Sequence, residues 1–166
     1  MEQKAIIQKT VDFVKETLTG AEGVHDWWHI YRVWKLAKHI AQTVEVDTFI
    51  VELGALLHDI ADAKFHNGDE EIGPREAREF LTSIQTDEDV IVHVEKIIAN
   101  ISFKGGNHTQ KFTSPELNVI QDADRLDAIG AIGIARTFNY GGHKGHELDK
   151  PEIDPKLTKS TNEDKN

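Results

Sequence analysis

The segment that decides the fold runs Thr48-Phe49-Ile50-Val51-Glu52-Leu53-Gly54-Ala55-Leu56-Leu57-His58-Asp59. Asp47 precedes it and is a suitable N-cap residue, so the sequence predicts a helix over residues 48–62. This helix would be apolar on nearly every side, and such a helix is normally buried at the centre of a domain. His58 and Asp59 then fall where an imidazole beside a carboxylate is costly unless the two are paired or bind a metal ion. An ordinary buried hydrogen bond between His and Asp remains the alternative.

The rest of the chain has a helical hydrophobic period, and the alternation typical of strands is not convincing anywhere. Further helices are predicted over residues 2–19, 26–43, 75–85, 88–101 and 115–138. Their ends are marked by Asp26, Pro74, Ser114-Pro115 and Gly141-Gly142, which are typical capping or terminating residues. We therefore expect an all-α fold, a compact bundle of about six helices. Residues 63–73 and 102–113 are expected to form loops that carry binding residues.

The domain organisation follows from a shift in composition near residue 142. Residues 1–142 are predicted to form one domain. In residues 143–166, 11 of 24 residues are charged and large apolar residues are few, so this polar tail is expected to be extended or disordered.

Composition excludes several classes of protein. The 166 residues include 19 Lys and Arg against 29 Asp and Glu, a net charge of −10, which argues against a nucleic-acid polymer as partner. There is no cysteine, so thiolate metal sites and thiol nucleophiles are excluded. No apolar run approaches the ~18 residues of a membrane span, and the N-terminus lacks a secretory signal, so a cytoplasmic location away from membranes is expected. A small phosphorylated substrate is compatible with this charge, because it needs only a few local cations or a metal ion.

Further candidate ligands lie in two other predicted helices. His29 lies one turn before Val33, near a core-facing stripe. Asp122, Asp124 and Asp127 interrupt an otherwise apolar helix, a pattern that is hard to explain as a solvated face. Exposed acids at the outer edge remain the alternative, above all for Asp122. Imidazole and carboxylate groups are good ligands for divalent ions, so these segments could supply the ligands missing around His58-Asp59.

The order of these motifs resembles a known family. His29-x-x-Arg32-Val33, then His58-Asp59, then Ala123-Asp124-Arg125-Leu126 is similar to the H…HD…D pattern of the HD-domain metal-dependent phosphohydrolases. The sequence around His29 and Asp124 resembles that of small, stand-alone bacterial HD proteins, some of which are nucleoside-triphosphate pyrophosphohydrolases. The resemblance covers residues 20–140 and implies that the metal ligands are His29, His58, Asp59 and Asp124.

The resemblance also implies a reaction. One divalent ion (Mn, Mg, Fe, Co or Ni) would promote hydrolysis of a phosphate ester or anhydride of a nucleotide or similar small molecule. The favoured reaction converts a (d)NTP to the monophosphate and pyrophosphate. Asp62 is expected to share a helix face with His58 and Asp59 and, together with Asp59, to act on the attacking water. A solvent-facing Asp62 is the alternative.

Four basic side chains are predicted to bind substrate phosphate: Arg32, Lys64, Lys104 and Arg125. Ordinary surface positions are the alternative for each. His66 and His93 are considered as acids for the leaving group.

Two other functions stay open at this point. One is a non-catalytic HD module that senses a ligand or binds a partner. The other is a di-iron HD oxygenase, which would need further His ligands near His93. The oligomeric state is left open, with a homodimer among the alternatives.

Overall fold

The structure is a computed structural model that describes residues 2–19, 26–61, 69, 71–101, 111–149 and 151–152. Over these residues it contains seven helices and no strand, which confirms the all-α prediction. The helices are α1 (Gln3–Thr17), α2 (Trp27–Ile40), α3 (Thr48–Leu57), α4 (Ile72–Ser83), α5 (Glu88–Asn100), α6 (Pro115–Asp127) and α7 (Gly130–His143). No helix among the described residues is long and apolar enough to cross a membrane.

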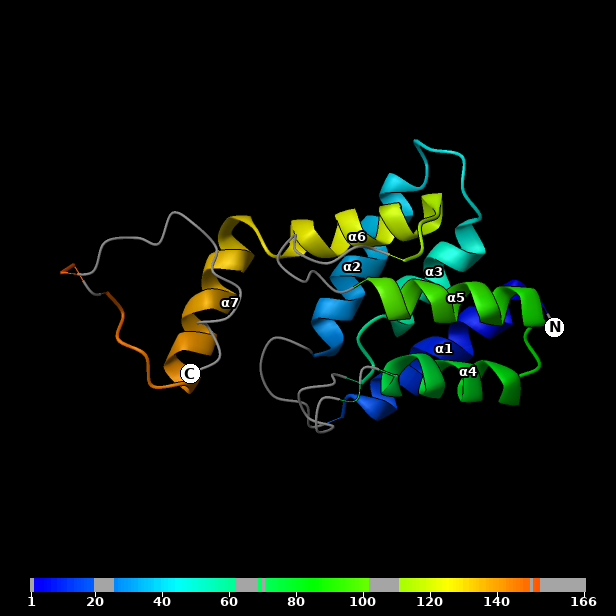
Figure 1. Ribbon diagram of the computed structural model, residues 1–166, viewed down its shortest axis with the longest axis horizontal. Helices are drawn as coiled ribbons and strands as arrows, with labels where there is room; N and C mark the ends of the chain where they lie inside the picture. The colour runs from blue at the N-terminus through cyan, green and yellow to red at the C-terminus, as the bar shows by residue number, and fades with distance from the viewer. Residues whose placement is uncertain are drawn as a thin grey trace.

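Helix α3 lies at the centre of the molecule, as its sequence predicts. Eight of its ten residues are buried, and it packs against α1, α2, α5 and α6. Gly54 permits the close approach of α6, because a Cβ atom at this position would lie 2.6 Å from Cδ1 of Ile120. Helix α2 packs against both α3 and α6, and α4 packs against α5 (Figure 1). The arrangement brings the start of α2, the end of α3 and the end of α6 together.

Three predicted N-caps are confirmed. The carboxylate of Asp26 accepts a hydrogen bond from the backbone N–H of His29, and that of Asp47 accepts from the N–H groups of Phe49 and Ile50. The hydroxyl of Ser114 accepts from the N–H of Leu117. Such caps fix where each helix begins, because they satisfy N–H groups that have no partner within the helix.

Several predicted helix ends were wrong. The central helix ends at Leu57 rather than residue 62, and α2 ends at Ile40 rather than residue 43. Helix α4 begins at Ile72, so Pro74 is its third residue instead of its first. Proline is still tolerated there, because N–H groups in the first helical turn have no partner within the helix.

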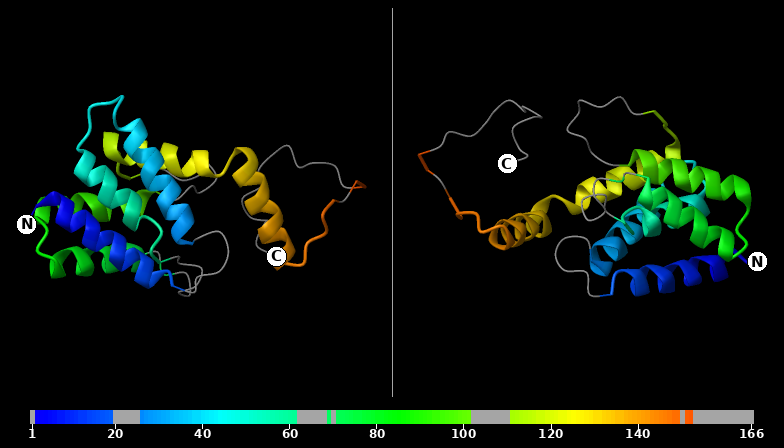
Figure 2. Two further views of the ribbon diagram at one scale, coloured as in Figure 1. Left: turned by 180° about the vertical axis from the view of Figure 1, so that it is seen from behind. Right: turned by 60° about the horizontal axis from the view of Figure 1, so that its bottom comes forward.

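The single helix predicted over 115–138 is two helices. Helix α6 ends at Asp127, Ile129 is extended, and Gly130, the first residue of α7, adopts a positive φ of 66°. Glycine adopts such a backbone readily because it lacks a Cβ atom, so Gly130 permits the change of direction. Helix α7 then continues through Gly141-Gly142 to His143. It stands apart from the six-helix body in all views (Figures 1 and 2).

Helix α7 and the residue that precedes it expose large apolar side chains. The exposed residues are Ile129, which is the N-cap, and Ile132, Ile134, Phe138 and Tyr140 within the helix. The predicted domain boundary at residue 142 falls one residue before the end of α7 and stays a prediction. Residues 153–166 of the predicted tail lie outside the described residues.

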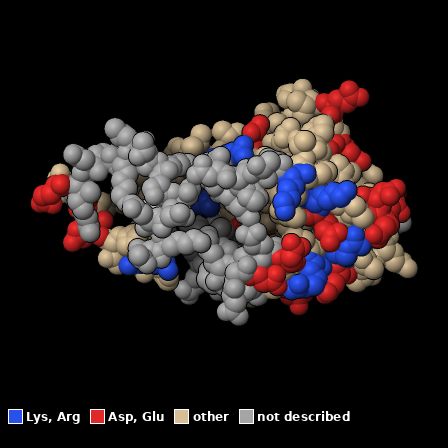
Figure 3. Space-filling view, in the orientation of Figure 1, with Lys and Arg blue, Asp and Glu red and all other residues tan. Residues whose placement is uncertain are grey.

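Acidic and basic side chains are interspersed over the part of the surface that holds α4 and α5 (Figure 3). Arg78, for example, pairs with both Glu88 and Glu95. Mixed charge of this kind is typical of a solvated surface.

Candidate metal centre

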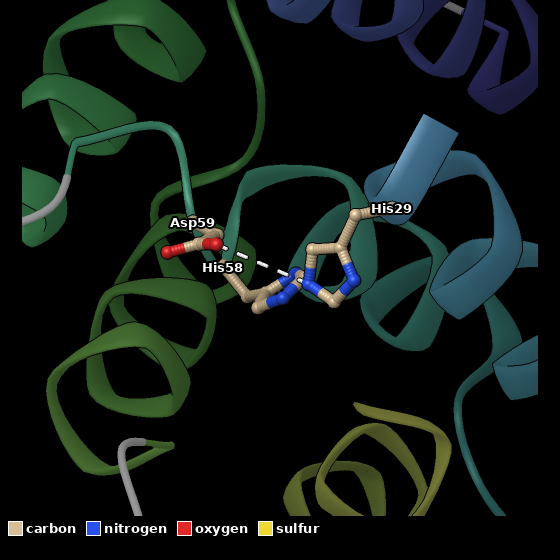
Figure 4. A group of neighbouring side chains, drawn as sticks. All are labelled: His29, His58 and Asp59. Atoms are coloured by element: carbon tan, nitrogen blue, oxygen red, sulfur yellow. Dashed lines mark ion pairs between the residues drawn. The ribbon is translucent and has the colours of Figure 1, made fainter. Parts of the chain in front are cut away.

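His29 projects from the first turn of α2 into the interior. The backbone N–H of His29 donates to Oδ1 of the capping residue Asp26 at 2.9 Å, and the His29 side chain is only 2% exposed. Figure 4 shows its ring directed toward His58 and Asp59, which come from a different element.

His58 and Asp59 lie immediately after α3, where the chain turns. Nδ1 of His58 donates a hydrogen bond to the carbonyl oxygen of Ala55 at 2.9 Å, since a carbonyl can only accept. In the neutral ring Nε2 then carries a lone pair. This Nε2 atom is buried and has no hydrogen-bond partner among the described residues. An unsatisfied polar atom in a buried position is costly, and a bound cation would remove that cost.

The ligand atoms predicted for the metal converge. One atom from each of His29, His58 and Asp59 lies within 4.8 Å of the others (Figure 4). Nε2 of His29 lies 3.9 Å from Oδ2 of Asp59 and 3.4 Å from Oδ1 of Asp124. The same Oδ1 of Asp124 lies 3.8 Å from Nε2 of His58. The structure therefore brings all four predicted ligands to one place, although Asp124 falls outside the tighter three-residue group.

Asp127 is a site residue to which the sequence assigned no role. Its side chain is 6% exposed, and its Oδ2 atom lies 2.8 Å from Nδ1 of His29. It is one helical turn after Asp124, so the two acids contact opposite edges of one imidazole ring. The only sign of Asp127 in the sequence was its spacing of three residues from Asp124, which places both acids on one side of a helix. A carboxylate behind a metal-binding histidine usually fixes its tautomer and orientation.

The Asp127 contact determines which ring nitrogen of His29 can bind a cation. Burial raises the pKa of Asp127, but hydrogen bonds from Arg32 and His29 outweigh burial and hold that pKa below its usual range. An ionised carboxylate only accepts, so Nδ1 of His29 donates to it and Nε2 keeps the lone pair. Nη1 of Arg136 also lies 3.3 Å from Nδ1, farther than Asp127.

Burial also favours the neutral form of His29. Removal from water lowers its pKa most, His58 and Arg136 lower it further, and the opposing effects of Asp127 and Asp124 are smaller in sum. A neutral imidazole is the form that coordinates metal ions. Two imidazole nitrogens and two carboxylates form a donor set that suits a divalent cation, so the residues present fit such an ion.

The other predicted site residues are placed differently. Arg32 contacts Asp127 through Nε (2.6 Å) and Nη2 (3.0 Å), and Arg125 and Asp122 are exposed on α6. His93 lies 3.0 Å from the Ser114 hydroxyl and packs against Phe112. The remaining predicted residues lie outside the described part of the chain: Asp62, Lys64, His66 and Lys104. Helix α3 ends at Leu57, so His58 and Asp59 lie just beyond its end.

Comparison with known proteins identifies the family. The family model for the HD domain matches residues 27–129, which span His29 through Asp127. The chain belongs to the HD domain family. The chain is 39% identical over 137 residues to the Bacillus subtilis protein YpgQ, a match that covers 82% of this chain and 66% of YpgQ. The chain thus spans slightly less than two thirds of that relative's length.

Several solved structures are similar over most of this chain. A HD-superfamily hydrolase from Bacillus thuringiensis is 42% identical, with a TM-score of 0.74, over 92% of this chain and 73% of that one. The structure of Bacillus subtilis YpgQ in complex with ADP is 37% identical, with a TM-score of 0.75, over 90% of this chain and 72% of YpgQ. A protein from Lactobacillus plantarum is 30% identical, with a TM-score of 0.78, over 97% and 74%.

Proposed function

We propose that this HD protein is a metal-dependent phosphohydrolase that hydrolyses a phosphate bond of a nucleotide. The favoured reaction is conversion of a (d)NTP to the (d)NMP and pyrophosphate. Hydrolysis of other phosphate esters or anhydrides of small molecules is the broader form of the same proposal.

One observation carries this proposal. Two imidazoles and two carboxylates from three distant segments converge, and Nε2 of His58 is buried with no hydrogen-bond partner among the described residues. Burying Nε2 of His58 without a partner is unfavourable, whereas a divalent ion would accept its lone pair. The side chains of Asp59 (19% exposed) and Asp124 (36% exposed) also reach solvent, so a substrate could approach from their side.

The chain's residues would divide the work as follows. His29, His58, Asp59 and Asp124 would hold one Mn, Mg, Fe, Co or Ni ion. When bound, such an ion polarises a phosphate oxygen and increases the acidity of water. Asp59 and Asp62 are the proposed catalytic carboxylates: they would orient the attacking water and accept its proton. Arg32, Lys64, Lys104 and Arg125 are proposed to hold phosphate oxygens.

A relative supports a nucleotide as substrate. YpgQ has been solved in complex with ADP, and it shares more than a third of its residues with this chain over the matched region. An HD-superfamily hydrolase from B. thuringiensis supports hydrolysis as the class of reaction.

The position of His93 argues against a di-iron oxygenase. His93 belongs to α5 and lies beside Ser114, the N-cap residue of α6, whereas Asp124 is ten residues farther along α6. Ten helical residues span about 15 Å, so His93 is too far from the four ligands to help hold a second iron.

The test is a hydrolysis assay with matched variants. We expect the Mn²⁺-loaded protein to release pyrophosphate from at least one (d)NTP. His58→Gln and Asp124→Asn should reduce the rate by at least about a hundredfold, because each removes a metal ligand.

Two controls match those variants in chemistry. His39 is exposed on α2 and Asp122 is exposed two residues before Asp124, so His39→Gln and Asp122→Asn should keep normal rates. Bound Mn²⁺ without turnover of nucleotides or other phosphate esters would instead support the non-catalytic module. Unchanged metal content in His58→Gln would refute the site itself.

A further inference from the structure

Asp127 is contacted by two arginines as well as by His29. Arg32 donates from Nε and Nη2, and Arg136, which comes from α7, donates from Nη1 to Oδ2 at 2.7 Å. Nη1 of Arg136 also lies 3.4 Å from the backbone oxygen of Asp127. One carboxylate therefore holds two guanidinium groups, although it can neutralise only one of them.

The two arginines keep unused donors. Nη1 of Arg32, and Nε and Nη2 of Arg136, have no hydrogen-bond partner among the described residues. The Arg32 side chain is 36% exposed and that of Arg136 is 22% exposed, so both reach solvent. Guanidinium groups bind phosphate oxygens through paired N–H donors, which makes these free donors suited to a phosphate.

More than one acid acts on the two arginines. Asp127 contacts both guanidinium groups, and Asp26 also acts electrostatically on Arg32. Nη1 of Arg136 lies 3.3 Å from Nδ1 of His29, so Arg136 is next to the ring whose Nε2 atom faces the other candidate ligands.

This inference rests on the proposed function. We propose that, when one phosphate group of a nucleoside di- or triphosphate is bound at the metal centre, Arg136 and Arg32 together bind the next phosphate group of the same nucleotide. Arg136 thereby makes the site prefer a chain of phosphates over a single phosphate. The sequence did not single out Arg136, because it lies 107 residues from His29 and was placed in the same predicted helix as Asp124.

The test measures binding rather than turnover. Calorimetric titration of the Mn²⁺-loaded protein compares imidodiphosphate, which resists hydrolysis, with inorganic phosphate. Arg136→Gln should weaken imidodiphosphate binding by about tenfold or more, as expected for the loss of charge-assisted hydrogen bonds. Phosphate binding and Mn²⁺ affinity should change little.

Two further variants make the result specific. Arg136→Lys keeps a cation on Asp127 but lacks the guanidinium fork, so it should retain the fold and Mn²⁺ affinity while losing part of the preference for imidodiphosphate. Arg78→Gln removes another arginine that holds two carboxylates, on α4, and should leave both affinities unchanged.

The opposing outcomes are distinct. If Arg136→Gln and Arg136→Lys lower the affinities for imidodiphosphate, phosphate and Mn²⁺ in parallel, Arg136 only positions His29 through Asp127, and the proposal is overturned. If neither ligand is affected, it is overturned as well. Arg136-dependent imidodiphosphate binding in a protein that hydrolyses no nucleotide would refute the proposed function and leave this inference standing.

Discussion

His29 shows at the scale of single residues how buried acids organise a site. Asp124 and Asp127 contact opposite edges of its ring, at 3.4 Å and 2.8 Å. Asp124 faces the other predicted ligands, whereas Asp127 holds the proton on Nδ1. The two acids therefore have different tasks despite lying three residues apart on one helix.

The first prediction concerns Asp127. In Asp127→Asn the side chain can no longer carry the negative charge that holds His29, Arg32 and Arg136, so His29 should lose its fixed orientation. We expect Mn²⁺ affinity to fall by about 10–100-fold in calorimetric titration, which is typical of losing such a supporting carboxylate. Asp122→Asn should leave the affinity unchanged, and equal affinities in the two variants would disprove the assigned role of Asp127.

The sequence indicated the site only in part. Residue types suggested candidate ligands, and the resemblance to the HD family selected His29, His58, Asp59 and Asp124, which the structure brings together. The contacts of Asp127 and Arg136 could not be predicted, because they join residues 98 and 107 positions apart. Such contacts depend on the packing of α2, α6 and α7, and no local pattern encodes that packing.

At the scale of helices, capping residues were more informative than hydrophobic periods. Asp26, Asp47 and Ser114 each fixed the start of a helix, because a side-chain oxygen there satisfies backbone N–H groups. Ends were harder to place, since apolar residues continue past Leu57 and past Asp127 whether or not the helix does. The break between α6 and α7 depends on Gly130. Glycine also occurs inside helices, as Gly54 does in α3, so its presence alone does not predict a break.

The second prediction concerns the start of α7. A Cβ atom on Gly133 would lie 2.2 Å from the backbone oxygen of Ala128 and 2.5 Å from its carbonyl carbon, so Gly133→Ala must displace the beginning of α7. We expect a loss of about 1–3 kcal/mol in the free energy of unfolding, measured with urea. Imidodiphosphate binding should weaken too, because Arg136 lies one turn farther along the displaced helix.

Gly142 provides the control for that variant. It lies in the same helix, and a Cβ atom there would meet nothing within 4 Å. Gly142→Ala should therefore keep imidodiphosphate binding and unfold at an equal or slightly higher urea concentration, as alanine favours helices. A Gly133→Ala protein as stable as Gly142→Ala would contradict the tight turn.

At the scale of the whole molecule, the four candidate ligands join segments that are far apart in the chain. His29 begins α2, His58 and Asp59 follow α3, and Asp124 lies near the end of α6. A cation held by all of them would connect these helices, and only in the folded state. Binding would therefore stabilise the fold as a whole.

The third prediction follows from that linkage. At a metal concentration about a hundred times the Kd, binding adds about 2.7 kcal/mol to stability. For a chain of this size we expect the Tm in scanning calorimetry to rise by about 5–10 °C when Mn²⁺ replaces EDTA. His39→Gln should respond like the native protein and His58→Gln should not respond. A native Tm that is indifferent to Mn, Mg, Fe, Co and Ni ions would contradict the metal centre.

The wide separation of the ligands also sets the order of events during synthesis on the ribosome. Asp124 follows Asp59 by 65 residues, which a ribosome adds in roughly 3–13 s at typical elongation rates. Until α6 emerges, the nascent chain contains His29, His58 and Asp59 but lacks the fourth candidate ligand, Asp124. The complete cage for a cation is therefore a late product of translation, assembled only after most of the helical core has been made.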